Sequence, residues 1–236
     1  MDKIRTLFFI SLLIIGISCS TGCEKNNSNE EDVMGNSTSQ IEKFDFSGKY
    51  VGDYITFGEY EQDNNNSNGK EDIEWLVLDK EDGKIFVLSR YILEFDKYHK
   101  KDEAVTWETS SIRSWLNTEF LYDAFEDSER AIIPIVDVEN DNNWSYGTNG
   151  GEPTRDKVFL LSFDEVKNYL PYSSERICAA TDYVLGKDGF EAWWLRTPGY
   201  DSYRASEILY DGYINDYSDP VYWERGVRPA MWINIK

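Results

Sequence analysis

The order of strand-like and helix-like segments constrains the fold of this chain most. Three strand-like runs come first, over residues 54–59, 73–78 and 85–89, and strand-like runs return from residue 193 onward. Helix-like segments occupy the middle of the chain. Because strands and helices are grouped in this way, without β-α-β alternation, the sequence predicts an α+β fold of antiparallel strands and short helices.

Two Asp-Gly pairs are expected to close hairpins. Asp82-Gly83 joins the second and third runs, and Asp211-Gly212 joins two β-rich runs near the C-terminus. An Asp-Gly pair between such runs is typical of a tight hairpin turn. The alternation of apolar and polar residues over 227–235 predicts one continuous last strand.

Helices are predicted in the middle of the chain. Apolar residues over 112–120 recur at helical spacing, which gathers them on one face. Ser162 and Glu165 form a capping-box pattern that begins another helix, and Pro171 ends it. A further helix is expected over 175–185.

The first 22 residues have the pattern of an export signal. Lys3 and Arg5 precede an apolar run over 7–17, which is shorter than the roughly 20 residues that span a bilayer. This arrangement is typical of a signal peptide. We therefore expect residues 1–22 to be a lipoprotein signal peptide, with a plain secretory signal or an uncleaved anchor as the alternatives.

A cysteine follows the apolar run, as in bacterial lipoproteins. Cys23, next to Gly22, is the expected lipidation site, and Cys19 is the alternative. Residues 23–43 are polar and acidic, so they are expected to be a flexible tether. The sequence thus predicts an exported protein that a lipid anchor attaches to the outer face of the cytoplasmic membrane, at the cell surface.

Residues 44–236 are predicted to form a single globular domain. Cys178 is the one cysteine in this part, so no disulfide within it can form. The domain must therefore rely on an ordinary apolar core, for which its length is sufficient.

Charge and composition exclude several classes of partner. The chain has 44 acidic and 24 basic residues, a net charge of −20, and such an excess of acid repels nucleic acid. One histidine excludes metal sites that need two or three of them.

A series of motifs resembles a known family. The motifs, in chain order, are Phe57-Gly58-Glu59-Tyr60, Ile73–Leu78, Thr106-Trp107-Glu108, Ser114–Asn117, Val158–Ser162, Trp194–Gly199 and Val227–Ile233. Over residues 50–236 the chain resembles the bacterial domain-of-unknown-function family numbered 6273, found in exported and surface proteins. That family has no established activity, so the resemblance implies no reaction.

The C-terminal motifs also look like the end of C-type-lectin-like domains, a fold shared with formylglycine-generating enzymes. This likeness implies a C-type-lectin-like variant of the α+β fold. It does not imply the oxidase chemistry of those enzymes, which use a cysteine pair where this domain offers Cys178 alone.

An Asn-rich loop is a candidate calcium site. Asp63, Asn65 and Ser67 stand at alternate positions, and Glu71 follows. Calcium takes six to eight oxygen ligands, and a turning loop can direct alternate side chains inward. The alternative interpretation is a solvated hairpin tip, because Asn and Gly accept positive φ angles.

Aromatic and polar residues alternate near the C-terminus. The candidate ligand-binding residues are Tyr210, Tyr213, Asn215, Tyr217, Asp219, Tyr222 and Trp223. Flat rings stack on sugar faces, and neighbouring polar groups bind hydroxyls. The lectin-like resemblance places this stretch at a ligand surface, whereas tyrosines that only cover a sheet are the alternative. Trp144 and Tyr146 form a second exposed aromatic pair.

Other chemistry-bearing residues are assigned structural roles. Arg196 and Arg228 lie in apolar runs and are expected to pair with buried carboxylates, with ligand binding as the alternative. His99 lies in a charged loop and is expected at the surface, and Cys178 is expected to be a small buried residue in a helix.

The sequence therefore predicts non-enzymatic binding of an extracellular carbohydrate or protein through the C-terminal aromatic stretch. The alternatives are a hydrolase that acts on glycans through a carboxylate pair, and a structural surface module.

Overall fold

The computed structural model describes residues 44–187 and 189–235 of the chain. The chain divides into two units, Met1–Thr38 and Ser39–Lys236, and the described residues all lie in the second. The predicted signal peptide, both candidate lipidation cysteines and the tether lie outside the described residues. Within the described ranges, no helix is long and apolar enough to cross a membrane.

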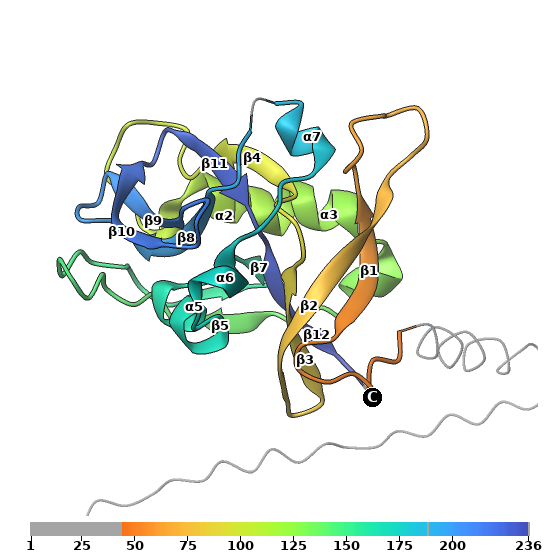
Figure 1. Cartoon of the computed structure of the whole chain (residues 1–236). Helices are drawn as coiled ribbons and strands as arrows, with labels where there is room; N and C mark the ends of the chain where they lie inside the picture. The colour runs from red at the N-terminus through yellow and green to blue at the C-terminus, as the bar shows by residue number, and fades with distance from the viewer. Residues whose placement is uncertain (1–43, 188, 236) are drawn as a thin grey trace, which may run out of the picture. The chain divides into compact units, whose positions relative to one another are not determined.

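Two five-stranded sheets form the framework of the domain (Figure 1). The first sheet has the order β1 (Tyr54–Tyr60), β2 (Glu71–Glu81), β3 (Lys84–Ser89), β12 (Ala230–Asn234) and β7 (Val158–Phe159). The second has the order β10 (Ile214–Pro220), β9 (Arg204–Ile208), β8 (Trp193–Pro198), β11 (Glu224–Val227) and β4 (Glu94–Lys97). β5 (Val136–Val138) and β6 (Thr154–Asp156) form a small third sheet.

The predicted α+β fold is confirmed. All strand pairs in these sheets are antiparallel except β8 and β11, which meet in parallel at Trp193 and Gly226. The helices are short. They are η1 (Trp107–Thr109), α2 (Ser111–Trp115), the π-helical η2 (Leu116–Phe120), α3 (Leu121–Ala124), α4 (Asp127–Arg130), α5 (Phe163–Tyr169), α6 (Ser173–Arg176) and α7 (Asp182–Leu185).

The hairpin between β2 and β3 forms where the sequence predicts it. Asp82 and Gly83 have φ angles of 46° and 73°, and two consecutive positive φ angles are what the favoured two-residue hairpin turn requires. The Asp211-Gly212 hairpin also forms, between β9 and β10, with a wider turn in which the Leu209 N–H donates to the Tyr213 carbonyl.

The predicted continuous last strand is wrong. β11 belongs to the second sheet and β12 to the first, so the chain changes sheets at Arg228-Pro229 (Figure 1). Pro229 lacks the N–H that would continue the ladder. The chain makes an earlier passage between the same sheets over residues 90–93. The two passages lie side by side, because the Leu93 N–H donates to the Val227 carbonyl at 3.0 Å.

The helix expected over 175–185 is also wrong as a single element. α6 and α7 are separate one-turn helices, and the chain between them runs alongside Ile92. The Ile92 N–H donates to the Ala179 carbonyl at 3.0 Å, and the Thr181 N–H donates to the Ile92 carbonyl at 3.2 Å. These long-range bonds replace the bonds that would continue a helix. Cys178 is buried, as expected, but lies in this non-helical stretch.

The other predicted helices form. α2, η2 and α3 follow one another without a break, and they cover the predicted range 112–120. At α5, the Glu165 N–H donates to the Ser162 hydroxyl at 3.1 Å, and the Ser162 N–H donates to the Glu165 carboxylate at 2.8 Å. This is the capping box that the sequence predicts.

Gly226 lets β11 approach its neighbours closely. A Cβ at this position would lie 2.6 Å from Ile92 Cγ2 and 2.8 Å from the Ala192 carbonyl oxygen. We expect Gly226→Ala to lower the free energy of unfolding by about 1–3 kcal/mol, because it overpacks the junction of the sheets. Urea unfolding measures this change.

Exposed Gly48 is the matched control, because a Cβ there would meet nothing within 4 Å. Gly48→Ala should change the free energy of unfolding by less than about 0.5 kcal/mol. Equal effects of the two substitutions would contradict the close packing described at Gly226.

Candidate functional site

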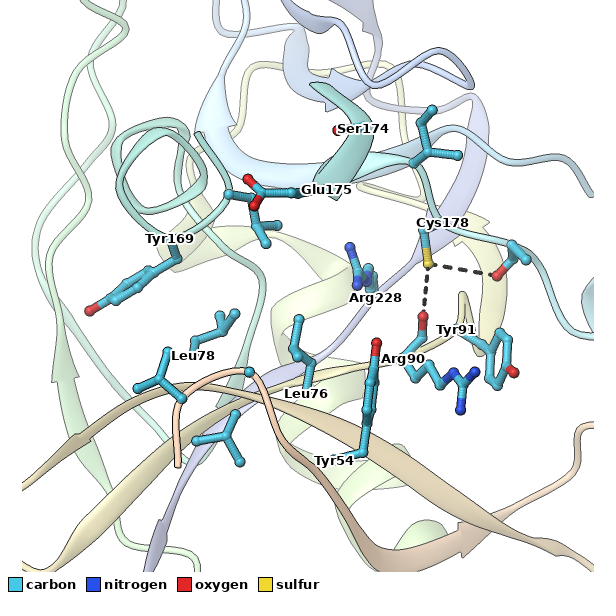
Figure 2. A pocket seen from close by; sticks show the side chains of 16 residues that line it. Tyr54, Leu76, Leu78, Arg90, Tyr91, Tyr169, Ser174, Glu175, Cys178 and Arg228 are labelled. Atoms are coloured by element: carbon cyan, nitrogen blue, oxygen red, sulfur yellow. Dashed lines mark hydrogen bonds between the residues drawn. The ribbon is translucent and has the colours of Figure 1, made fainter. Parts of the chain in front are cut away.

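A pocket of about 530 Å³ lies where the chain passes between the sheets. Its walls come from β1, β2, the passage after β3, the segment from α5 to Ala179, and Arg228 (Figure 2). The side chains that line it include Tyr54, Leu76, Leu78, Arg90, Tyr91, Glu175, Ile177, Cys178 and Arg228. The volume is in the range of pockets that hold small molecules.

Arg228 carries the only buried side-chain cation lining this pocket in the described part of the chain, with 4% of its surface exposed. Its Nε–H donates to the Ser89 carbonyl at 2.9 Å, whereas Nη1 is buried with no hydrogen-bond partner. The guanidinium carbon lies 5.0 Å from the centre of a Trp193 ring. The expected ion pair of Arg228 is therefore wrong, since no carboxylate among the described residues forms a salt bridge with it.

Arg196 differs, and its expected ion pair is confirmed. Its Nη2–H donates to Glu165 at 2.8 Å, and other N–H groups donate to the Leu160 and Glu139 carbonyls. The guanidinium of Arg196 is thus fully hydrogen bonded, whereas that of Arg228 is not.

Burial shifts the pKa values of two side chains that line the pocket, Arg228 and Cys178. Desolvation lowers the pKa of Arg228, while the nearby Cys178 thiol and Tyr54 hydroxyl act in the opposite direction. Burial also raises the pKa of the Cys178 thiol, more than the positive Arg228 lowers it. The thiol donates to the Arg90 carbonyl at 3.2 Å. Cys178 is therefore a protonated thiol and not an activated nucleophile.

The rim of the pocket carries paired charges. Arg90 forms a 2.8 Å ion pair with Glu74, and its guanidinium lies 4.8 Å and 5.2 Å from the ring centres of Tyr54 and Tyr91. On another side, the Glu175 carboxylate accepts a hydrogen bond from the Tyr172 N–H at 3.0 Å. Figure 2 shows Tyr54 and Arg228 converging on the centre of the pocket.

A second candidate site is an exposed aromatic cluster of Tyr146, Tyr200 and Tyr217. Tyr200 and Tyr217 stack with ring centres 4.4 Å apart, and Tyr146 meets both rings edge-on at about 6 Å. The Arg204 guanidinium lies 4.9 Å from the Tyr200 ring centre. Tyr146 and Tyr217 are about half exposed, at 48% and 53%.

The cluster forms because the loop over 140–151 folds onto the second sheet. Asn143 is buried, and its amide donates to the carbonyls of Pro198 and Asp216 at 2.9 and 3.0 Å. Its carbonyl oxygen accepts from the Ser145 and Tyr146 N–H groups. Sequence reasoning named Tyr146 and Tyr217 in separate candidates and missed Tyr200 and Arg204.

The seven predicted ligand-binding residues do not form one surface. Tyr217 belongs to the aromatic cluster. Tyr210 and Tyr213 are exposed at the turn between β9 and β10, and Tyr222 and Trp223 lie in the turn before β11. The remaining two, Asn215 and Asp219, face an internal network.

That network is centred on Glu207, whose side chain is fully buried. Arg225 Nε–H donates to Glu207 at 2.6 Å, and the Asn215 amide donates to Glu207 at 3.0 Å. Asp219 shares the same Arg225. Burial raises the pKa of Glu207 to about 6, despite the opposing effect of Arg225, and the Asp219 charge adds to the rise.

In the predicted calcium loop, the carboxylates that lie close together differ from the predicted set of calcium ligands. Glu61, Asp63 and Glu71 have oxygens within 4.8 Å of one another, and Glu61 was missed by sequence reasoning. Asn65 and Ser67 instead hydrogen bond to each other at 2.6 Å.

Hydrogen-bond donors already satisfy these carboxylates. The Asn65 N–H donates to Glu61 and to Asp63, and the Gln62 and Asp63 N–H groups donate to Glu71. Calcium binding by this loop stays a prediction.

His99 is less exposed than the sequence suggests. Its Nε2 lies 3.0 Å from Glu103, and its Nδ1 accepts from the Ser111 N–H at 3.2 Å, with the Ser111 hydroxyl equally close. The order Ser111, His99, Glu103 resembles a catalytic triad. The backbone N–H occupies the Nδ1 lone pair that would have to take the hydroxyl proton, so the arrangement fits a local structural role.

The two five-stranded sheets and the short helices define an α+β domain. It carries a pocket lined by the buried Arg228 and a separate exposed aromatic cluster. The sequence pattern of the domain of unknown function DUF6273 matches residues 82–235, and the chain belongs to this family. The matched part is shorter than the range 50–236 inferred from motifs, because β1 and β2 both lie before it.

No curated protein and no solved structure matches the chain. The C-type-lectin-like fold and the expected localisation therefore stay predictions.

Glu207 provides a prediction on pH dependence. The folded state holds the proton of Glu207 more tightly than the unfolded chain does, since its pKa rises from 4.5 to about 6. The resulting stabilisation is present below pH 4.5 and is lost as the pH rises through about 6. The loss amounts to roughly 2 kcal/mol.

Urea unfolding of the wild type and Glu207→Gln across this pH window measures the loss. The free energy of unfolding of the wild type should fall relative to that of the variant as the pH rises. Glu152→Gln, at an exposed position, controls for the removal of one surface charge. A constant difference between wild type and Glu207→Gln would contradict the raised pKa.

Proposed function

We propose that this protein is a membrane-anchored extracytoplasmic lipoprotein whose domain binds carbohydrate without catalysis, through the cluster of Tyr146, Tyr200 and Tyr217. The observation that carries the proposal is this group of stacked, half-exposed rings beside Arg204. Exposed aromatic rings stack on the apolar faces of sugars, and a neighbouring guanidinium donates hydrogen bonds to hydroxyls.

The rigidity of the cluster supports recognition. Asn143 fixes the loop that carries Tyr146, and the Thr148 hydroxyl donates to the Tyr200 carbonyl at 2.8 Å. Because these bonds hold the rings in place before binding, little side-chain freedom is lost when a ligand arrives. A protein ligand is the alternative occupant, since tyrosine and arginine also serve as anchors in protein interfaces.

Among the carboxyl groups of the described residues, only Glu207 has a clearly raised pKa, and its position favours binding over hydrolysis. Glu207 has the raised pKa that suits a general acid, but its side chain is fully buried and bonded to Arg225 and Asn215. A general acid must reach the leaving oxygen of the substrate. Glu207 instead fits a structural role as a buried hydrogen-bond partner of Arg225 and Asn215.

A glycan array with the full chain tests the binding proposal. We expect binding to at least one glycan class, and a loss of about tenfold or more in affinity for Tyr146→Ala and for Tyr217→Ala, because each removes a stacking ring. Isothermal titration with the bound glycan measures the affinities.

Tyr210→Ala is the matched control, because Tyr210 is also an exposed tyrosine (69%) but lies outside the cluster. It should bind the glycan as the wild type does. If the array is silent while pull-down recovers a protein partner, the carbohydrate assignment fails.

The anchor rests on the sequence of the first residues, with Cys23 as the lipidated residue. In a bacterial host, we expect Cys23→Ser to abolish incorporation of a labelled fatty acid and to move the protein out of the membrane fraction. A diglyceride with acyl chains is what stable attachment requires. Cys19→Ser is the matched control and should keep both properties, whereas the opposite result would assign the lipid to Cys19.

A further inference from the structure

We propose that the pocket around Arg228 binds the carboxylate of a small organic acid that has an apolar body. The site is separate from the aromatic cluster, so this proposal and the proposed carbohydrate binding stand or fall independently. The ligand carboxylate would lie against the Nη edge of Arg228, where the buried Nη1 requires the wall to open slightly, and the apolar body would lie along the leucine and tyrosine walls.

Arg228 lacks a counter-ion among the described residues. Arg228 is 4% exposed, makes one hydrogen bond, through Nε, and has Nη1 buried without a partner. Glu175 is the one carboxylate among the lining residues and accepts the Tyr172 N–H, whereas Glu74, which lies outside the lining, pairs with Arg90. A buried guanidinium without an anion is destabilising, so an anion that enters the pocket gains more than it would at the surface.

The guanidinium plane of Arg228 has a fixed orientation. The bond from Nε to Ser89 and the Trp193 ring at 5.0 Å fix the plane of the guanidinium. A planar carboxylate matches a guanidinium edge with two parallel hydrogen bonds. The Tyr54 hydroxyl lies on the same side of the pocket and offers a further hydrogen bond (Figure 2).

Apolar side chains and aromatic rings form much of the pocket wall around Arg228. Leu76, Leu78 and Ile177 form apolar walls, and the Tyr54 and Tyr91 rings form the edge. Arg228 is the one cation of the pocket that lacks a carboxylate partner among the described residues, because Arg90 is paired with Glu74. One unpaired positive charge, in a pocket whose lining already includes the Glu175 carboxylate, suits a monocarboxylate and not a phosphate dianion, which would bring a second uncompensated charge into the pocket.

Two sources share this chemistry, a free small acid and the C-terminus of a peptide. The experiment uses the full chain and four probes: phenylacetate, its neutral amide phenylacetamide, N-acetyl-Leu-Phe with a free carboxylate, and inorganic phosphate. Isothermal titration and thermal unfolding are the readouts. Phenylacetate should bind and raise the melting temperature, whereas phenylacetamide and phosphate should do neither. Binding of N-acetyl-Leu-Phe as well would extend the ligand class to peptide ends.

Arg228→Met should abolish the effect of phenylacetate. Without ligand it should melt at the same temperature as the wild type or higher, because it removes an unpaired buried charge. Arg155→Met, at an exposed arginine remote from the pocket, controls for the lost charge and should keep phenylacetate binding. Tyr54→Phe should weaken binding without abolishing it.

A second readout does not depend on the folding of any variant. Cys178 is buried in the pocket wall, so N-ethylmaleimide reaches its thiol only when the fold opens locally. Phenylacetate should slow this modification in the wild type, as followed by mass spectrometry of the Cys178 peptide, because a bound ligand disfavours the opening. The proposal is overturned if phenylacetate changes neither the melting temperature nor the modification rate of the wild type. It is also overturned if Arg228→Met binds phenylacetate as well as the wild type does.

Discussion

Two adjacent passages of the chain between its sheets, over residues 90–93 and at Arg228-Pro229, are the constraint on which the rest of the structure depends. Ser89 links them at one point, since its N–H donates to the Pro229 carbonyl and its own carbonyl accepts from Arg228. These bonds hold the end of β3, in the first sheet, against Arg228-Pro229, where the chain leaves the second sheet. Gly226 permits the close approach, and the Arg228 pocket opens beside it.

The sequence was sufficient wherever local chemistry decides the structure. The turn at Asp82-Gly83 and the capping box of Ser162 and Glu165 involve residues no more than a few positions apart, so their patterns predict them. The last strand and the helix over 175–185 failed for the opposite reason. In both, backbone bonds to a distant segment, at Val227 and Ile92, override the local pattern.

The candidate sites show the same division. Tyr146 and Tyr217 were visible as aromatic residues in polar loops, but their meeting depends on Asn143, which bonds across to Pro198 and Asp216. A buried arginine in an apolar run suggested an ion pair, which holds for Arg196. Whether a carboxylate reaches the guanidinium of Arg228 depends on how the two sheets join. No local pattern in the sequence indicates how they join.

The pocket is assembled from two sources along the chain. Arg228, Cys178 and Arg90 belong to the part that matches the family pattern, whereas Tyr54, Leu76 and Leu78 come from the hairpin that precedes residue 82. The apolar wall thus combines Leu76 and Leu78, from outside the matched part, with Tyr91 and Ile177 from within it. Substitutions confined to the first hairpin would change one side of the pocket while Arg228 stays in place.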